Sequence, residues 1–209
     1  MPAPERLAEA RAAVGYRYLE LDSKKHTARL LRPGMRLDLG GIAMGYAVDE
    51  SLALLRSMGI TRALLDASGD IGVGDPPPGK EGWRIGIAPD AADAPPSRYL
   101  ILANAAVTTS GDAFQHVDIG GKRYSHVVDP RTGLGLTNRT SVTVVARDCI
   151  DADSLTKPVS VLGPEAGVKF IEKIPGVAVL VVRDNDGKTE VFESDRFKHL
   201  KFEPAGPAP

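Results

Sequence analysis

The spacing of apolar residues along the chain predicts both helices and strands. Between Gly41 and Met58 they recur at helical spacing and form one broad face, typical of an amphipathic helix. β-Branched residues predominate from Arg139 to Ala146, and every residue from Val177 to Val182 is aliphatic, so both segments are predicted to be buried strands. Further helices are predicted over 4–13, 151–162 and 164–174. Further strands are predicted over 16–21, 27–31, 35–39, 63–67, 71–74, 83–87, 99–102, 105–109, 114–119, 122–128 and 189–192.

These elements come in runs of strands and runs of helices rather than in strict alternation. That order predicts the α+β class, with one domain over residues 1–203. The last six residues, 204–209, consist of Pro, Ala and Gly and are expected to form a disordered tail.

Composition excludes several classes of protein. Hydrophobic residues make up 43% of the chain and charged residues 25%, which indicates a folded globular protein. The 26 basic and 27 acidic residues give a net charge of −1, so nonspecific nucleic-acid binding is not expected. The one cysteine, Cys149, excludes an internal disulfide and a cysteine-type zinc site. The sequence predicts neither a transmembrane segment nor a signal peptide in this chain.

A glycine pair marks the first candidate site. Asp38 is followed by Gly40 and Gly41, and a predicted helix then begins. Glycines let the backbone approach a ligand, and a helix start presents free N–H groups, so an anion or pyrophosphate site is one interpretation. An ordinary helix-capping turn is the alternative.

Hydroxyl and carboxyl side chains mark two further candidates. Thr108, Thr109 and Ser110 precede Gly111 and Asp112, a group suited to binding a flat heterocycle or a phosphate, with a β-bulge as the alternative. Asp66 and Asp70 flank a break between two predicted strands; they could bind ribose hydroxyls or a metal, but a turn with a solvated carboxylate is the favoured interpretation.

His126 precedes an Asp-Pro turn and could act as a general base, because the unperturbed pKa of histidine lies near neutrality. A structural histidine is the alternative, and His26, His116 and His199 are expected to have surface or packing roles.

Two acids begin the helix predicted from residue 151. Asp151 can cap this helix, and Asp153 can face outward as a hard oxygen ligand for Mg²⁺. The alternative is that both acids merely favour the positive end of the helix dipole.

Five segments follow one another along the chain. They are LDLGGIAMGYAVDE (37–50), SGDIGVG (68–74, with WRIGIA at 83–88), AVTTSGD (106–112), KRYSHVVDPRTG (122–133) and SVTVVARDCIDADSLTKPVSVLGPEAG (141–167). In this order they resemble the ApbE-type FAD:protein FMN transferases, over residues 14 to about 187. The resemblance implies an α+β fold related to the tunnelling fold, binding of FAD and Mg²⁺, and transfer of FMN from FAD to a Thr or Ser hydroxyl of an acceptor flavoprotein.

The resemblance also implies roles for individual residues. Asp38 is expected to contact the flavin nucleotide, the Gly41 carbonyl and the Asp153 carboxylate to bind the metal, and His126 to deprotonate the acceptor hydroxyl. The residues expected to line the flavin are Ser110, Gly111, Asp112, Val127 and Val128.

This chain departs from the family pattern at two positions near the expected metal. Met44 stands where the family usually has lysine, and Lys157 stands where it usually has threonine, four residues after Asp153. Thr156, one place earlier, is then the hydroxyl expected at the metal, while Met44 and Lys157 are expected beside FAD. We hypothesise that Lys157 partly replaces the metal ligand and weakens Mg²⁺ dependence; the alternative is a lysine pointing into solvent.

The sequence thus predicts an FAD:protein FMN transferase. A flavin-binding relative without transfer activity, a Mg²⁺-dependent FAD pyrophosphatase releasing FMN and AMP, and a non-enzymatic scaffold are the alternatives. Other members have an additional N-terminal portion, so we expect a short or truncated member. Family members are commonly exported, which implies a periplasmic or outer-face, membrane-anchored location.

Overall fold

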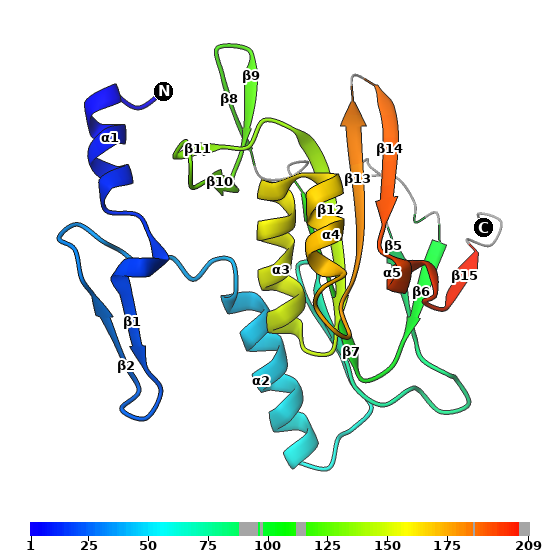
Figure 1. Ribbon diagram of the computed structural model, residues 1–209. Coiled ribbons are helices and arrows are strands. Elements are labelled where there is room, and N and C mark those ends of the chain that lie inside the picture. Colours follow the sequence, from blue (N-terminus) through cyan, green and yellow to red (C-terminus); the bar gives the residue numbers. More distant parts are fainter. Residues whose placement is uncertain (88–95, 97, 112–115, 186, 205–209) are drawn as a thin grey trace.

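The computed structural model describes residues 1–87, 96, 98–111, 116–185 and 187–204 (Figure 1). A six-stranded antiparallel sheet, in the order β14-β13-β12-β7-β4-β3, forms the centre of the molecule. Its strands are β3 (Leu64–Ala67), β4 (Asp70–Val73), β7 (Ala105–Gly111), β12 (Arg139–Ala146), β13 (Ala178–Asn185) and β14 (Lys188–Glu193).

Apolar layers cover both faces of this sheet. Val142 and Val144 of β12 belong to the core on the helical side, whereas Val145 belongs to the core on the opposite side. Successive side chains of a strand point to opposite faces, so a strand covered on both sides is apolar at every position. The residues from Val177 to Val182 are therefore all aliphatic because side chains on both faces of this strand are buried.

Three helices cover one face, as Figure 1 shows: α2 (Ala43–Ser57), α3 (Cys149–Leu162) and α4 (Pro164–Ile171). The opposite face is covered by a three-stranded sheet and a short helix, with Leu100 and Phe197 fully buried between the layers. These elements are β5 (Trp83–Ile87), β6 (Arg98–Leu102), α5 (Asp195–Lys198) and β15 (Phe202–Pro204). Within the described residues, every helix is too short or too polar to cross a membrane.

The N-terminal elements lie beside the central sheet, beyond α2 in Figure 1. The side chains of Tyr16 and Leu21 are 85% and 72% exposed there. Four short strands stand near the upper end of α3. The elements of these two groups are α1 (Pro4–Ala12), the 3₁₀ turn η1 (Tyr16–Tyr18), β1 (Leu19–Asp22), β2 (Thr27–Leu30), β8 (His116–Ile119), β9 (Lys122–Ser125), β10 (Val128–Asp129) and β11 (Leu134–Gly135).

The predicted α+β class is confirmed, with differences in individual elements. The strand predicted over 35–39 is wrong: its alternation of apolar residues suits a strand, but among the described strands none pairs with it, and Leu37 and Leu39 are half exposed. The strand predicted over 122–128 is interrupted at 126–127, and α5 and β15 were not predicted. Pro204, assigned to the tail, ends β15; residues 205–209, and Phe114 of a predicted strand, lie outside the described residues.

Helices α2 and α3 touch at Gly45. A Cβ added at Gly45 would lie 2.4 Å from the carbonyl oxygen of Cys149, so only glycine fits this contact. Asp49, one turn later, caps α3: its two carboxylate oxygens accept the N–H groups of Cys149 and Ile150, each at 2.8 Å. The cysteine is fully buried, and burial raises the pKa of its thiol to about 12, which indicates a packing role.

Gly45→Ala should therefore destabilise the fold, although alanine normally favours a helix over glycine. The added methyl group must push α2 away from α3, and overpacking of this kind costs about 1–3 kcal/mol. Chemical denaturation monitored by circular dichroism measures the change. Glu50→Ala, which also places alanine in α2 but at an exposed position, is the matched control. A Gly45→Ala variant as stable as the control would contradict the close contact.

Candidate functional site

A line of polar side chains runs between α3 and the central sheet, where an apolar interface would otherwise stand. Asp153, Thr156 and Ser160 share one face of α3 and are only 2%, 0% and 7% exposed. Thr108 of β7 and Thr140 of β12 lie on the sheet face that packs against the helices. We call this line the polar seam. Its members are Asp70, Thr108, Ser110, Thr140, Asp153, Thr156, Lys157 and Ser160.

The polar seam holds hydrogen-bonding capacity that the protein itself does not use. Among the described residues, four buried side-chain atoms lack a hydrogen bond of normal geometry, and three of them belong to the seam. These three are Asp70 Oδ1, Thr108 Oγ1 and Thr140 Oγ1; the first two are cross-strand neighbours, and the Thr108 hydroxyl lowers the pKa of Asp70 although the two make no hydrogen bond of normal geometry. Leaving such a group unpaired costs about 1–3 kcal/mol, so a cluster of them indicates a place where a polar ligand binds.

One end of the seam is an ion pair between Lys157 and Asp153. The Lys157 ammonium contacts Asp153 Oδ1 and also donates to the Asp153 carbonyl oxygen at 3.1 Å. The other carboxylate oxygen, Oδ2, accepts the N–H of Gly45 at 3.3 Å. A Cβ on Gly41 would lie 3.4 Å from Lys157 Cε, so the lysine stem passes directly along this glycine. Gly41, Asp153 and Lys157, which the sequence analysis assigned to the neighbourhood of one metal site, therefore lie together in the structure.

Asp70 lies next to this ion pair and has a perturbed ionisation. Burial raises the pKa of its carboxyl group, and the negative charge of Asp153 adds to this effect. The Thr108 hydroxyl and the Lys157 ammonium act in the opposite direction but do not cancel it. Asp66, by contrast, only accepts the N–H of Gly69 at 2.9 Å and forms the expected turn.

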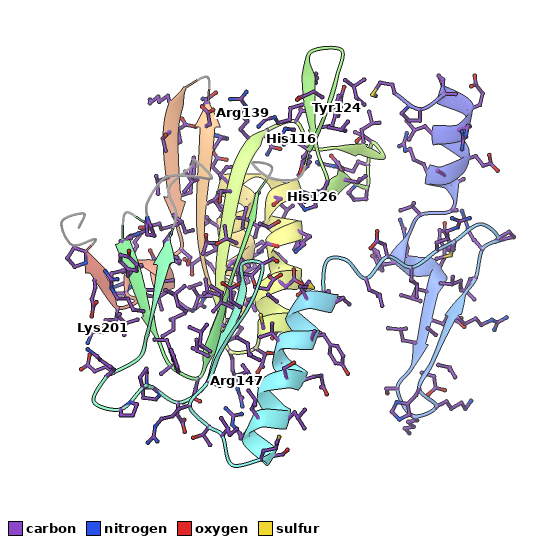
Figure 2. The ribbon with its side chains drawn as sticks, turned by 180° about the vertical axis from the view of Figure 1, so that it is seen from behind. His116, Tyr124, His126, Arg139, Arg147 and Lys201 are labelled. Carbon is purple, nitrogen blue, oxygen red and sulfur yellow. The ribbon has the colours of Figure 1, made fainter. Side chains whose placement is uncertain are left out.

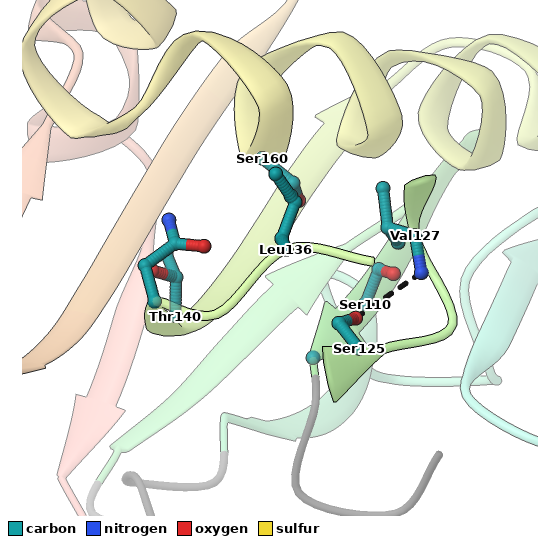
Figure 3. A pocket seen from close by; sticks show the side chains of 8 residues that line it. Ser110, Ser125, Val127, Leu136, Thr140 and Ser160 are labelled. Carbon is teal, nitrogen blue, oxygen red and sulfur yellow. Dashed lines mark hydrogen bonds between the residues drawn. The ribbon is translucent and has the colours of Figure 1, made fainter. Parts of the chain in front are cut away.

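The other end of the seam opens into a pocket of about 240 Å³ (Figure 3). Hydroxyl groups from both sheet and helix reach it, and the Val127 N–H donates to Ser125 Oγ at 3.1 Å on its rim. The Val127 carbonyl accepts the Leu136 N–H at 2.8 Å. The lining residues are Ser110, Gly111, Ser125, Val127, Leu136, Asn138, Thr140 and Ser160.

Helix α3 joins the two ends. Asp153 and Ser160 are seven residues apart, which corresponds to about 10 Å along a helix at 1.5 Å per residue. The seam therefore suits an elongated ligand with a charged group at one end and a flat polar group at the other.

Several expected site residues lie at the margins of the seam. Asp38 is exposed, and its Oδ1 accepts the N–H of Gly40 at 2.8 Å within its own turn. Met44, in the first turn of α2, and Val128, in β10, are 42% and 51% exposed. The Thr156 hydroxyl donates to the Asp153 carbonyl oxygen at 2.7 Å, so its hydrogen stays within the helix. Asp112 lies outside the described residues.

His126 is exposed in the bend between β9 and β10, at the base of the β8–β9 hairpin (Figure 2). Both of its sequence neighbours, Ser125 and Val127, line the pocket. The histidine therefore lies beside the pocket with its side chain exposed to solvent.

The sequence analysis favoured a solvated turn for Asp70, and it missed five of the eight pocket residues. Asp70 is paired with Thr108 across β4 and β7, a relation that only the sheet register provides. One signal was available for Ser160, because it follows Asp153 by two helical turns on the same face. The missed pocket residues are Ser125, Leu136, Asn138, Thr140 and Ser160.

The position of Asp70 leads to a stability prediction. Because folding raises its pKa, the ionised carboxylate destabilises the folded state at any pH above that raised pKa. Asp70→Asn should therefore raise the thermal midpoint at pH 7, and the gain should shrink as the pH falls to about 4, near the unfolded pKa of aspartate. Thermal melts at both pH values measure this. A variant less stable than the wild type at pH 7, or a gain independent of pH, would contradict the burial of this charge.

Comparison with known proteins places this arrangement in context. The model of the ApbE family matches residues 1–181. The FAD:protein FMN transferase of Vibrio cholerae is 32% identical over 200 residues, covering 95% of this chain and 59% of that protein. The enzyme of the same name from Treponema pallidum is 31% identical, covering 87% of this chain and 54% of that protein.

Solved structures agree with the sequence comparison. The ApbE protein of Thermotoga maritima superposes with a TM-score of 0.83 at 32% identity, covering 95% of this chain and 63% of that structure. The flavin transferase ApbE of Vibrio cholerae also gives 0.83, at 30% identity. The chain spans between half and two thirds of the length of these relatives. With its family-model match over most of its length and its shared fold, the chain belongs to the ApbE family.

Proposed function

We propose that this chain acts as an FAD:protein FMN transferase, with FAD bound along the polar seam. The observation that carries the proposal is the set of three unsatisfied polar atoms, which lie between an ammonium group at one end and a hydroxyl-lined pocket at the other. FAD has the matching form, with a pyrophosphate separated from a flat ring by the ribityl arm. The relatives from Vibrio cholerae and Treponema pallidum carry the name of this activity.

The pocket is the proposed site of the flavin ring. Its empty space of about 240 Å³ is partly open to solvent, so the pocket would receive one edge of the ring. The pyrimidine edge of the flavin alternates hydrogen-bond donors and acceptors. Hydroxyl groups can both donate and accept, so Thr140 and Ser110 can adapt to that edge, and Asn138 adds an amide.

The opposite end is the proposed site of the pyrophosphate. Lys157 supplies a positive charge there, and the start of α2 adds the favourable end of a helix dipole. Gly41 has no Cβ, which allows the Lys157 side chain to lie beside the glycine turn.

In the proposed reaction an acceptor hydroxyl oxygen attacks the phosphorus of the FMN half of FAD. The bond from this phosphorus to the bridging oxygen breaks, AMP leaves with that oxygen, and a phosphoester joins FMN to the Thr or Ser of the acceptor flavoprotein. His126 is the proposed acceptor of the hydroxyl proton, the role that the family resemblance implies; its exposed side chain, between two residues that line the pocket, is within reach of a protein acceptor.

The Mg²⁺ ion implied by the family resemblance would need Gly41, Asp153 and Thr156 as oxygen donors. In the folded structure, these residues do not fit the role of metal ligands. Both Asp153 carboxylate oxygens are engaged, one by the Lys157 ammonium and one by the Gly45 N–H, so the only charged ligand of the expected set is already paired. Charge on the pyrophosphate must therefore be balanced by the protein's own groups.

The location expected from the resemblance, periplasmic or anchored on the outer face of the membrane, is part of this proposal. Fractionation of cells that produce the full-length gene product tests it.

One incubation tests the function itself. The protein is mixed with FAD and an acceptor domain that presents a Thr or Ser, and the acceptor is examined for flavin fluorescence on a denaturing gel. Fluorescent acceptor supports the proposal. Three results contradict it: free FMN and AMP without labelled acceptor, which indicate hydrolysis; bound flavin without turnover, which indicates a binding protein; and no bound flavin, which leaves a scaffold.

His126→Asn should lower the transfer rate by roughly 10²–10⁴-fold, because the proton acceptor is lost. FAD affinity, measured by quenching of flavin fluorescence, should change little, since the exposed histidine stands outside the seam. His199→Asn, in the C-terminal cap of α5 on the opposite side of the sheet, is the control. Parallel loss of FAD affinity and transfer would instead assign His126 a structural role.

A further inference from the structure

The buried carboxylate of Asp153 is paired with a lysine side chain of the same helix. Its side chain is 2% exposed, and a charge so deeply buried must be paired. Lys157 provides the partner from one turn further along α3, where residues i and i+4 share a face. The lysine side chain is 27% exposed, so its ammonium lies at the border between seam and solvent and is turned inward onto Asp153.

Within the part of the chain that the structure describes, the hydrogen bonds of this pair use two of the three N–H donors of the Lys157 ammonium. A lysine ammonium has three N–H donors. One faces Asp153 Oδ1 and one the Asp153 carbonyl oxygen, at 3.1 Å. The third remains for an anionic oxygen placed against the seam.

The ammonium also stands where a divalent ion would have to bind. An ion joining the Gly41 carbonyl to the Asp153 carboxylate must lie between these two residues, and the Lys157 stem passes within contact distance of Gly41 on its way to Asp153. Mg²⁺ requires near-octahedral oxygen ligands at about 2.0–2.1 Å, which would bring it against a like charge held by the same carboxylate.

We propose that Lys157 is the built-in cation of this site: it excludes Mg²⁺ from Asp153 and binds the pyrophosphate of FAD directly. The exclusion of Mg²⁺ stands on the ion pair alone, whereas the role toward the pyrophosphate rests on the proposed function. Members of the family that carry threonine at this position have no such ammonium, so the inference concerns this chain specifically.

Metal binding by the protein without FAD is the first test. Isothermal titration with MgCl₂ should give no stoichiometric binding to the wild type, and Mg²⁺ should leave its thermal midpoint unchanged. Lys157→Thr leaves Asp153 without its partner and should lower the thermal midpoint, and Mg²⁺ should then bind with a stoichiometry near one and restore stability. Lys169→Thr, at an exposed position of α4, is the matched control and should behave as the wild type.

FAD affinity is the second test, measured by flavin fluorescence in EDTA and in Mg²⁺. The wild type should bind equally well in both. Lys157→Thr should lose about tenfold in EDTA, the range expected for one charge-assisted hydrogen bond, and regain it with Mg²⁺. Lys157→Gln, which keeps the side-chain length without the charge, covers the case in which Lys157→Thr does not fold.

The two tests separate this inference from the proposed function. Stoichiometric Mg²⁺ binding to the wild type, FAD binding that requires Mg²⁺, or unchanged FAD affinity in the Lys157 variants would overturn the inference. Absence of FAD binding in every variant would overturn the proposed function, and with it the role toward the pyrophosphate, while the titration with Mg²⁺ alone would still decide whether Lys157 excludes the metal.

Discussion

The site depends on one close contact, the approach of α2 to α3 at Gly45. Because Gly45 lacks a Cβ, the backbone of α2 lies against the carbonyl of Cys149, and Asp49 fixes the pair by capping α3. This contact places the Gly45 N–H on the carboxylate of Asp153 and brings Gly41 alongside Lys157. With a wider helix spacing, the glycine turn and the ion pair would belong to separate parts of the surface.

The polar seam is stable because the apolar layers around it are extensive. Valines of β12 and β13 fill both faces of the sheet and offset the cost of buried hydroxyl and carboxyl groups. Thr108 and Thr140 remain unsatisfied within this framework, and the pKa of Asp70 stays raised. Unsatisfied groups of this kind are typical of binding sites, where a ligand supplies the missing partners.

The spacing of apolar residues was sufficient to predict those helices and strands whose own sequence shows a clear periodicity. The strand from Arg139 to Ala146 and the helices around 43–57 and 149–162 follow from apolar spacing alone. The loop at 35–39 has the alternation of a strand, but a strand also needs a neighbour, and that is a property of the tertiary fold. For the same reason Asp70 was interpreted as part of a turn and Thr140 was missed, because only sheet register and strand orientation place them against α3. The sequence identified Lys157 as a departure from the family pattern. Whether its side chain points into solvent or toward Asp153 could not be predicted, because that depends on how α2 packs against α3.

The central claim is that a flavin dinucleotide binds over the two ends of the seam, at Lys157 and at the hydroxyl-lined pocket. Hydrogen–deuterium exchange with and without FAD tests it most directly, because the two segments that border the seam lie far apart in the sequence. FAD should slow amide exchange both in residues 38–46 and in residues 125–138, while the β1–β2 hairpin exchanges unchanged. Bound flavin that leaves both segments unchanged, or that protects only the β5–β6 side of the molecule, would contradict the account.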